Sequence, residues 1–389
     1  MIKRISAAII AAALSMSMLT ACSSGNASGG SSNVSSESSV SSDSSSLLGT
    51  SSEESSDDEG GVTVSKEAME TPSASQDIFA MDTYMTVTAY GDKCTEAVQA
   101  AVDEINRLDN LWSVGNSESE ISILNENGSV ILSDETYTVV KEALELYDST
   151  GGLFDITVYP LMVEWGFTTE DYKVPTDDKI KELLKLTGID KITLDDETHQ
   201  ITLQTGTQID LGGIAKGYTS AKIMDIFSEY GIVSGLVSLG GNVQLYGTKV
   251  DGSDWRVGVE NPDNTIKALS TSDYIGVVQI SDKALITSGG YQRYFVDENG
   301  EKHHHIIDPR TGSPSNSGLI SVTIVSDDGL LADGLSTSLF IMGKDDAVSY
   351  WHEHSDQFDF ILVDSEGKIY VSKGIESNFS SELDYEIVE

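Results

Sequence analysis

The sequence has few residues that could cross-link or interrupt it. Among 389 residues there are only two cysteines, Cys22 and Cys94, and six prolines. Two cysteines allow at most one disulfide, and none is possible if Cys22 is modified. Cys94 stands where a helix is expected to begin, which favours a packing role over a nucleophilic one. The fold must therefore be held by a packed core, and few prolines interrupt its regular elements.

Basic residues are also scarce. Lys and Arg number 23 against 63 Asp and Glu, and the formal net charge is -40. Such a surface repels phosphate backbones, so we expect no nucleic-acid partner. The same charge suits a protein that concentrates divalent cations, although solubility alone would explain it equally well.

The first 22 residues have the pattern of a lipoprotein signal peptide. Lys3 and Arg4 precede an apolar run over residues 5–19, and Leu19-Thr20-Ala21 leads into Cys22. We therefore expect cleavage before Cys22, lipidation of its thiol, and attachment to the extracytoplasmic face of the cell membrane. The alternative is an ordinary signal peptide in which the cysteine is incidental.

Residues 23–75 differ in composition from the rest of the chain. Ser, Gly, Asp and Glu dominate this stretch, and almost nothing in it could be buried. Such a segment cannot offset the entropy of ordering, so we expect a disordered tether. Residues 76–389 have regular apolar runs and are long enough for a single large domain of two closely packed lobes.

Apolar periodicity in residues 76–389 predicts mixed helices and strands. Because they do not follow a strict βαβ alternation, we expect an α+β fold. A hairpin is expected at 191–194 and 200–203, and further strands at 85–90 and near residues 236, 255, 277, 294, 322 and 360. Helices are expected at 94–112, 133–147, 175–186, from the Gly-rich segment at 210–217 to about 230 and, as one helix, within 331–354.

A Gly-rich segment, Asp210-Leu-Gly-Gly-Ile-Ala-Lys-Gly217, is expected to join a strand end to a helix start. Glycines let the backbone approach a ligand, and exposed amides at a helix start favour an anion. Asp210 could hold a ribose or a ring nitrogen, and Lys216 could meet a phosphate or a ring carbonyl. The segment fits neither the P-loop nor the Rossmann pattern, so a purely structural turn remains open.

Three consecutive histidines follow the segment Thr287–Tyr294. In a strand, His303 and His305 would share one face and His304 would take the other, so the three cannot easily ligate one metal ion. Nothing nearby in sequence completes a tetrahedral site. A single inward histidine, His305, is the candidate for chemistry, and the alternative is a hydrogen-bonded histidine that supports the turn at 308–309.

Asp333 and Thr337 lie four residues apart at the start of the last long helix, on one helical face. A carboxylate, a hydroxyl and a backbone carbonyl are the hard oxygen ligands that Mg²⁺ prefers beside phosphate. The alternative is that Asp333 is only a negative charge at the helix N-terminus and that Thr337 is only a packing residue. Earlier in the chain, residues 151–155 and the aromatics of 160–167 could wall a flat ring system or simply fill a core.

Taken together and in order, these segments resemble the FAD:protein FMN transferase family, also called the ApbE family. The resemblance extends over nearly all of residues 76–389. It implies a T-fold-like α+β enzyme that uses Mg²⁺ to cleave the pyrophosphate of FAD, its substrate. FMN would pass to a Thr or Ser hydroxyl of an acceptor protein, and AMP would leave. The segments are 81–83, 119–122, 151–155, 210–217, 240–242, 255–258, 305–312 and 332–337.

The resemblance also implies roles for individual residues. His305 would assist proton transfer. Asp333, Thr337 and the Gly213 carbonyl would hold Mg²⁺. The residues implied to contact FAD are Met81, Leu153, Phe154, Asp155, Asp210, Lys216 and Ile307.

Two positions depart from the family pattern. Residues 114–117 lack the bulky side chain common in that loop, which leaves open how much FAD is hydrolysed rather than passed to protein. Gly334 replaces an alanine, a change expected to be harmless.

Three other functions remain as alternatives: a metal-dependent FAD pyrophosphatase, a flavin-binding or solute-binding lipoprotein without catalysis, and an envelope adhesin. For the transferase, the expected partner is a membrane-associated redox protein on the same face, by analogy with the family. The chain has no Asp-x-x-Ser/Thr-Gly-Ala-Ser/Thr segment of its own. Self-flavinylation is therefore not indicated.

Overall fold

The computed structural model describes residues 71–262 and 273–389, and these residues belong to one compact unit. The predicted signal peptide, Cys22 and residues 23–70 of the predicted tether lie outside the described residues. No helix within the described ranges is long and apolar enough to span a membrane.

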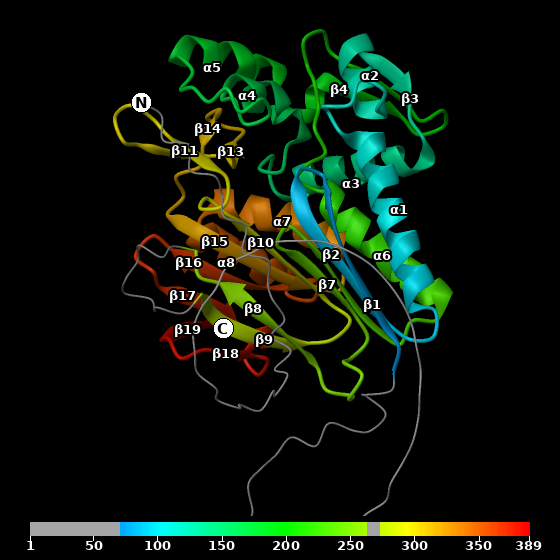
Figure 1. Ribbon diagram of the computed structural model, residues 1–389. Helices are drawn as coiled ribbons and strands as arrows, with labels where there is room; N and C mark the ends of the chain where they lie inside the picture. The colour runs from blue at the N-terminus through cyan, green and yellow to red at the C-terminus, as the bar shows by residue number, and fades with distance from the viewer. Residues whose placement is uncertain (1–70, 263–272) are drawn as a thin grey trace, which may run out of the picture. The chain divides into compact units, whose positions relative to one another are not determined.

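A nine-stranded sheet forms the centre of the fold (Figure 1). Its neighbours pair antiparallel except the last two strands, which are parallel. In spatial order the strands are β1 (Ser73–Ala80), β2 (Thr83–Tyr90), β6 (Ser234–Leu239), β7 (Asn242–Tyr246), β10 (Ala284–Gly289), β15 (Leu319–Ser326), β16 (Phe358–Asp364), β17 (Ile369–Ser372) and β19 (Tyr385–Val388).

Both faces of this sheet are buried, because alternate residues of its strands enter different cores. In β10, Leu285 packs on one side and Ile286 on the other. The Leu285 side is covered by a smaller sheet of β8 (Trp255–Glu260), β9 (Tyr274–Ile280) and β18 (Phe379–Ser380). The Ile286 side is covered by helices, among them α6 (Ala215–Tyr230), α7 (Gly329–Met342) and α8 (Lys344–His354).

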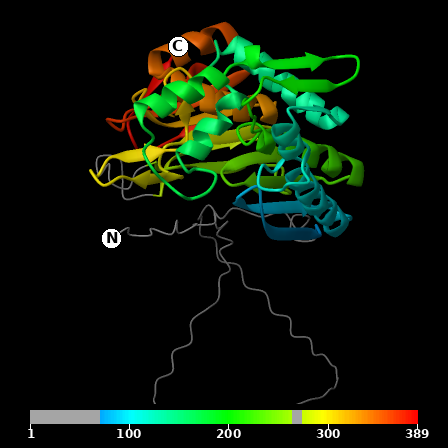
Figure 2. The same ribbon diagram turned by 90° about the horizontal axis from the view of Figure 1, so that it is seen from above.

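Helix α1 (Cys94–Trp112) packs on the β1–β2 hairpin, and Figure 2 shows the helix lying against the blue strands. Its buried residues are all apolar and recur at helical spacing, and Cys94 is a buried free thiol at its first position. The pattern thus predicted both the bounds and the inward face of this helix.

The remaining elements form a region beyond one end of the sheet (Figure 1). Its helices are α2 (Glu120–Asn127), α3 (Asp134–Ser149), α4 (Tyr159–Glu164) and α5 (Asp177–Leu183). A three-stranded sheet contains β3 (Ser129–Ile131), β5 (Gln200–Leu203) and β4 (Ile192–Asp195). One short hairpin pairs β11 (Tyr294–Val296) with β12 (Lys302–His304). A second pairs β13 (Ile307–Asp308) with β14 (Ser313–Pro314). The short 3-10 helices are η1 (Ile156–Val158), η2 (Leu184–Leu186), η3 (Ile189–Lys191) and, beside β17, η4 (Lys373–Ile375).

Most predicted elements are confirmed, including the β4–β5 hairpin and the helix capped by Ser133. Three predictions were wrong. Strand β1 begins at Ser73, inside the predicted tether, because its alternating small and apolar residues pair with β2 along their full length. The helix predicted within 331–354 is two helices, α7 and α8. They are separated at Gly343, whose φ of 81° ends the first one.

The third error concerns the segment before Asp210. No strand ends there, because β5 stops at Leu203. The side-chain amide of Asn125 instead pairs with Ile209 as a strand would, donating to its carbonyl and accepting from its N–H, both at 2.8 Å. A side chain 84 residues earlier therefore holds the Gly-rich segment in place.

Candidate active site

The carboxylate of Asp333 is the most enclosed acidic group of the predicted set, with 4% of the residue exposed. One oxygen, Oδ2, accepts from the backbone N–H of Gly217 at 2.9 Å, and Oδ1 accepts from the side-chain amide of Asn242 at 2.9 Å. The ammonium of Lys216 lies 3.8 Å from Oδ1. Helix α6 and strand β7 thus fix the carboxylate of α7 in one orientation.

Helices α6 and α7 approach each other closely at Gly217. A Cβ atom at this position would lie 2.3 Å from the Gly329 carbonyl oxygen and 2.7 Å from the Asp333 Cβ, so only glycine fits. Gly217 is the third residue of α6, where the N–H has no acceptor within the helix, and here it donates to Asp333. The Gly213 carbonyl belongs to the segment just before the same helix start.

The Gly-rich loop brings Asp210 and Lys216 to this crossing. Asp210 Oδ1 accepts from the Gly212 N–H at 3.0 Å, and Lys216 Nζ donates to the Gly212 carbonyl at 3.3 Å. Burial raises the pKa of Asp210, opposed by the Gly212 hydrogen bond and then by the charges of Arg293 and Lys216. The loop therefore carries one carboxyl group and one ammonium group, each hydrogen-bonded to Gly212.

Met81 stands in the two-residue turn that joins β1 to β2. Both Met81 and Asp82 have positive φ, 48° and 58°, the pattern of a type I′ turn, which favours Asn-Gly rather than these residues. The Met81 sulfur lies 3.9 Å from the Thr219 hydroxyl, which ties the turn to α6. Strain of this kind persists where the surroundings enforce it, often beside ligands.

Phe154 lies under the same crossing. Its ring is buried, and it would be 3.1 Å from a Cβ at Gly213 and 3.6 Å from one at Gly334. Leu153 is buried in the same core. An alanine at Gly334 would also place its Cβ 2.5 Å from Leu146, so glycine is required here unless Leu146 moves. Gly334 therefore leaves room for the neighbouring side chains of Leu146 and Phe154.

Thr337 lies one helical turn after Asp333 and is half-buried. Its hydroxyl is 3.5 Å from the hydroxyl of Ser288 on β10, which also pairs with Ser336 at 2.7 Å. Three hydroxyl groups thus gather between β10 and α7, next to the Asp333 carboxylate along the helix. Their oxygens are neutral and of the type that a hard cation accepts.

His305 follows β12 and is half-buried. Its Nδ1 donates to the Arg293 carbonyl at 3.1 Å, which leaves Nε2 unprotonated and able to accept a hydrogen bond. Burial first, and the charge of Arg293 second, lower its pKa to about 3, so the ring is neutral at physiological pH. The Arg293 side chain in turn donates to the Phe167 carbonyl.

Two predicted residues are held by local structural contacts instead. Asp155 caps η1, its Oδ1 accepting from the N–H and the hydroxyl of Thr157 at 2.8 and 2.5 Å. Burial raises its pKa, and those hydrogen bonds oppose the rise. Ile307 is buried in a small core with Trp165 and Phe167. Asp155 nevertheless lies near the loop, since the Asp210 N–H donates to Ile156 at 2.9 Å.

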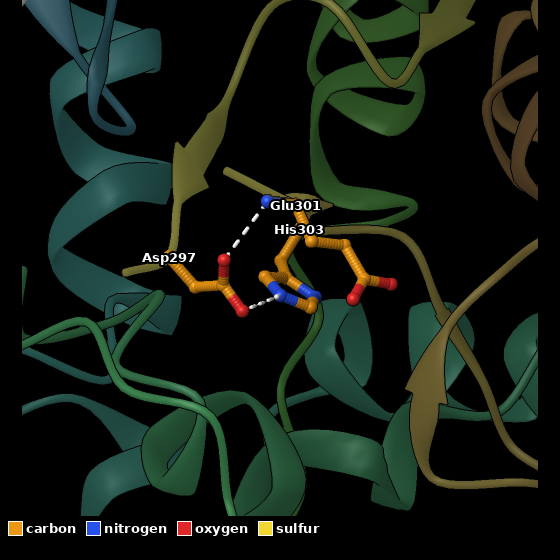
Figure 3. Close-up of side chains that lie close together, drawn as sticks. All are labelled: Asp297, Glu301 and His303. Carbon is orange, nitrogen blue, oxygen red and sulfur yellow. Dashed lines mark hydrogen bonds and ion pairs between the residues drawn. The ribbon is translucent and has the colours of Figure 1, made fainter. Parts of the chain in front are cut away.

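The neighbouring histidines are accounted for separately. His304 donates from Nε2 to the Ser315 carbonyl at 2.9 Å. His303 stacks near Trp165 and lies 3.4 Å from Asp297, which also accepts from the Glu301 N–H (Figure 3). Three potential ligand atoms, one fewer than a tetrahedral site takes, lie together beside His303. Asp297, Glu301 and His303 offer ligand atoms within 4.8 Å, although hairpin capping explains their arrangement.

Asn242 and Arg293 have roles that the sequence did not reveal. Both lie in segments singled out above, but a buried amide that orients a carboxylate 91 residues away leaves no local signal. The carbonyl of Arg293, which fixes the His305 ring, is a backbone group and so is independent of residue type.

The comparisons with known proteins agree with this geometry. The model of the ApbE family matches residues 81–362. Curated relatives named FAD:protein FMN transferase include one from Vibrio cholerae and one from Haemophilus influenzae. The first is 34% identical across 64% of this chain and 75% of its own, and the second is 32% identical across 68% and 76%.

Solved structures give the same result. The ApbE protein of Thermotoga maritima superposes with a TM-score of 0.73 at 32% identity, and the flavin transferase ApbE of Vibrio cholerae with 0.70 at 27%. Each match covers 79% of this chain and 99% of the other. The family model spans most of the chain, and the architecture agrees throughout the described residues. This chain belongs to the ApbE family.

Proposed function

We propose that this chain is an FAD:protein FMN transferase that cleaves the FAD pyrophosphate with the help of Mg²⁺, joins FMN to a Thr or Ser hydroxyl of an acceptor protein, and releases AMP. The observation that carries the proposal is the fixed Asp333 carboxylate, oriented by Gly217 and Asn242 and placed 3.8 Å from Lys216. The names of the curated relatives support the same activity.

The donor set suits a hard cation. Within residues 71–262 and 273–389, each Asp333 oxygen accepts one N–H, so each has a lone pair for a cation. Thr337 and the Gly213 carbonyl add neutral oxygens, and together these are the ligand types that Mg²⁺ takes beside substrate phosphates. When bound there, Mg²⁺ would neutralise charge that develops on the pyrophosphate.

Side chains of the protein would bind the substrate and assist proton transfer. Lys216 at the start of α6 would bind the pyrophosphate oxygens, since a helix N-terminus favours an anion. The acceptor oxygen would attack the phosphorus of the FMN half, and the bridging P–O bond would break with AMP as the leaving group. His305 Nε2 would accept a hydrogen bond from the attacking hydroxyl and relay its proton, which finally resides on AMP or solvent. Phe154 and Met81 would contact the flavin nucleotide and form walls of its site.

Product analysis tests the proposal. The protein is incubated with FAD, Mg²⁺ and a flavin-free protein that carries an Asp-x-x-Ser/Thr-Gly-Ala-Ser/Thr segment, followed by intact-mass measurement and in-gel flavin fluorescence. We expect a Mg²⁺-dependent adduct of FMN mass and one AMP per adduct. Free FMN with AMP would instead establish a pyrophosphatase, and intact FAD would establish a flavin-binding protein.

We also propose that Cys22 anchors the enzyme by a lipid to the extracytoplasmic face of the cell membrane, where its partner is a membrane-associated redox protein. The support is the signal pattern of residues 1–22 and the long Ser-rich segment after it. Metabolic labelling with a palmitate analogue should mark the wild-type chain and not Cys22→Ser. Labelling of the variant would contradict the anchor.

A further inference from the structure

Two large aromatic side chains lie exposed at the tip of the β1–β2 hairpin. Phe79 is 61% exposed and Tyr84 is 54% exposed. They are cross-strand partners, and their rings meet edge to face with centroids 5.1 Å apart. Adjacent apolar side chains left in water carry a free-energy cost, and a grouped apolar patch of this kind is characteristic of a contact surface.

The middle of this hairpin face is polar. Strand alternation places Ser75 and Asp77 of β1, with Thr86 and Thr88 of β2, on the same face as the aromatic pair. The Ser75 and Thr88 hydroxyls are 2.8 Å apart, and Thr86 donates to Asp77 at 2.6 Å. These four residues separate the exposed pair at the tip from Tyr90 at the far end, whose ring packs near Trp255.

The aromatic pair adjoins the candidate active site. Phe79 and Tyr84 lie on either side of the turn that carries Met81, which contacts α6 through Thr219. The Gly240 N–H donates to the Tyr84 carbonyl at 3.1 Å, so β2 is also tied to the β6–β7 turn. The pair is thus held in one position before any partner arrives, which lowers the entropy cost of binding.

We propose that the Phe79–Tyr84 pair is the surface on which the acceptor protein docks. The inference rests on the proposed function, since a transferase of this kind must hold a second protein with a hydroxyl close to Met81 and Lys216. Asp77 and Asp82 flank the pair, and the hairpin over residues 73–90 contains no Lys or Arg. The acceptor segment that fits has an apolar side chain and a basic side chain close to its hydroxyl residue.

A protein partner fits this position better than a lipid surface does. The chain enters β1 at Ser73, the opposite end of the strand from the pair, and eight strand residues span about 25 Å (Figure 1). A membrane that contacted the pair would also cover the neighbouring turn and block the acceptor. Lipid binding is therefore the competing outcome in the test.

The pair could alternatively serve only to stabilise the hairpin, because cross-strand aromatic contacts do so. That role predicts a different result. Loss of the pair would then loosen the Met81 turn, so that the melting temperature and FAD affinity would fall together with acceptor affinity.

The experiment compares the full chain with the double variant Phe79→Ser/Tyr84→Ser and with Ile131→Ser. Ile131 is 67% exposed on β3 and serves as the matched control. Binding of a flavin-free protein that carries the Asp-x-x-Ser/Thr-Gly-Ala-Ser/Thr segment is measured without FAD, so the result does not depend on catalysis. FAD binding by flavin fluorescence, the melting temperature and binding to vesicles of anionic phospholipid are measured in parallel.

We expect the acceptor Kd to rise about tenfold or more in the double variant and to be unchanged in the control, with FAD affinity and melting temperature preserved. Unchanged acceptor binding overturns the proposal, as does a joint loss of acceptor binding, FAD binding and thermal stability. Loss of vesicle binding alone assigns the pair to lipid. A wild-type chain that binds the acceptor but forms no FMN adduct would disprove the proposed reaction and leave the docking surface standing.

Discussion

Asp333 and His305, the two residues given most of the proposed chemistry, are held in opposite ways. Asp333 lies in a close helix crossing, where N–H groups from Gly217 and Asn242 stabilise its negative charge. His305 lies in an irregular segment after β12, where burial and the cationic Arg293 disfavour its charged form. One half of the site favours a fixed charge, and the other favours a neutral ring.

The two halves also differ in how their contacts are spread along the chain. The hydrogen bonds to Asp333 join residues 116 and 91 positions apart, whereas those of His305 join residues 12 apart. Substitutions in the Asp333 half should therefore disturb both activity and packing, since several elements meet there. Substitutions in the His305 half should act locally.

The largest effect is expected from Asp333→Ala. Transfer of FMN should fall by at least about 10³-fold, because charge stabilisation at the pyrophosphate is lost. The buried donors of Gly217 and Asn242 also lose their acceptor, so unfolding free energy should drop by about 1–3 kcal/mol while the fold persists. Asp178→Ala, at a side chain that is 99% exposed, is the control. A fully active Asp333→Ala enzyme would remove the metal assignment.

Gly217→Ala tests whether the helix crossing positions that carboxylate. The added Cβ meets the Gly329 carbonyl, so α6 and α7 must separate, at a cost of about 1–3 kcal/mol. Gly115→Ala is the matched control, since its nearest neighbour would be at 3.6 Å. Urea unfolding and transfer rates should both decline in the first variant only. Equal behaviour of the two variants would show that the crossing tolerates a wider gap.

Asn242→Leu isolates the orientation of Asp333 from its charge. With one hydrogen bond gone, the Mg²⁺ concentration required for half-maximal transfer should rise about 10–100-fold, as expected when a residue that orients a metal ligand is lost. Metal titration of the transfer reaction measures this effect. An unchanged Mg²⁺ requirement would mean that Gly217 alone orients the carboxylate.

The last prediction concerns His305 and the pH dependence of stability. Its pKa of about 3 in the folded state lies below the ordinary value of 6.5, so the unfolded chain binds a proton first as pH falls. The unfolding free energy should therefore decrease from about pH 6.5 toward pH 3 and gain nothing from this group above 6.5. Urea titrations across this range should show a shallower slope for His305→Gln. Burial also lowers the pKa of His304, so some slope should remain.

The sequence predicted the elements that obey simple periodicity. Helix α1 was predicted to the residue, because its buried positions follow one helical face. The α7–α8 break was missed because Gly343 also fits a continuous helix, and only its backbone angle separates the two. Strand β1 was missed because its exposed serines match the composition of the preceding segment.

The site was predictable in its residue types and less so in its arrangement. Spacing alone placed Asp333 and Thr337 on one helix face, and the family resemblance brought in Met81 and Gly213. The structure places Lys216 beside Asp333, a contact between residues far apart in the chain. Asp155 caps η1, and residue type alone does not tell whether a buried carboxylate binds a ligand or a backbone N–H group.

The turn at Met81 and Asp82 has a consequence for engineering. Asn-Gly in a type I′ turn avoids the conformational cost that these residues bear, of about 1 kcal/mol or more each. Selection for heat resistance would therefore favour Asn-Gly in this turn. The Met81 side chain, which reaches α6, would then be lost. In this hairpin, selection for thermal stability and selection for catalysis would favour different amino acids.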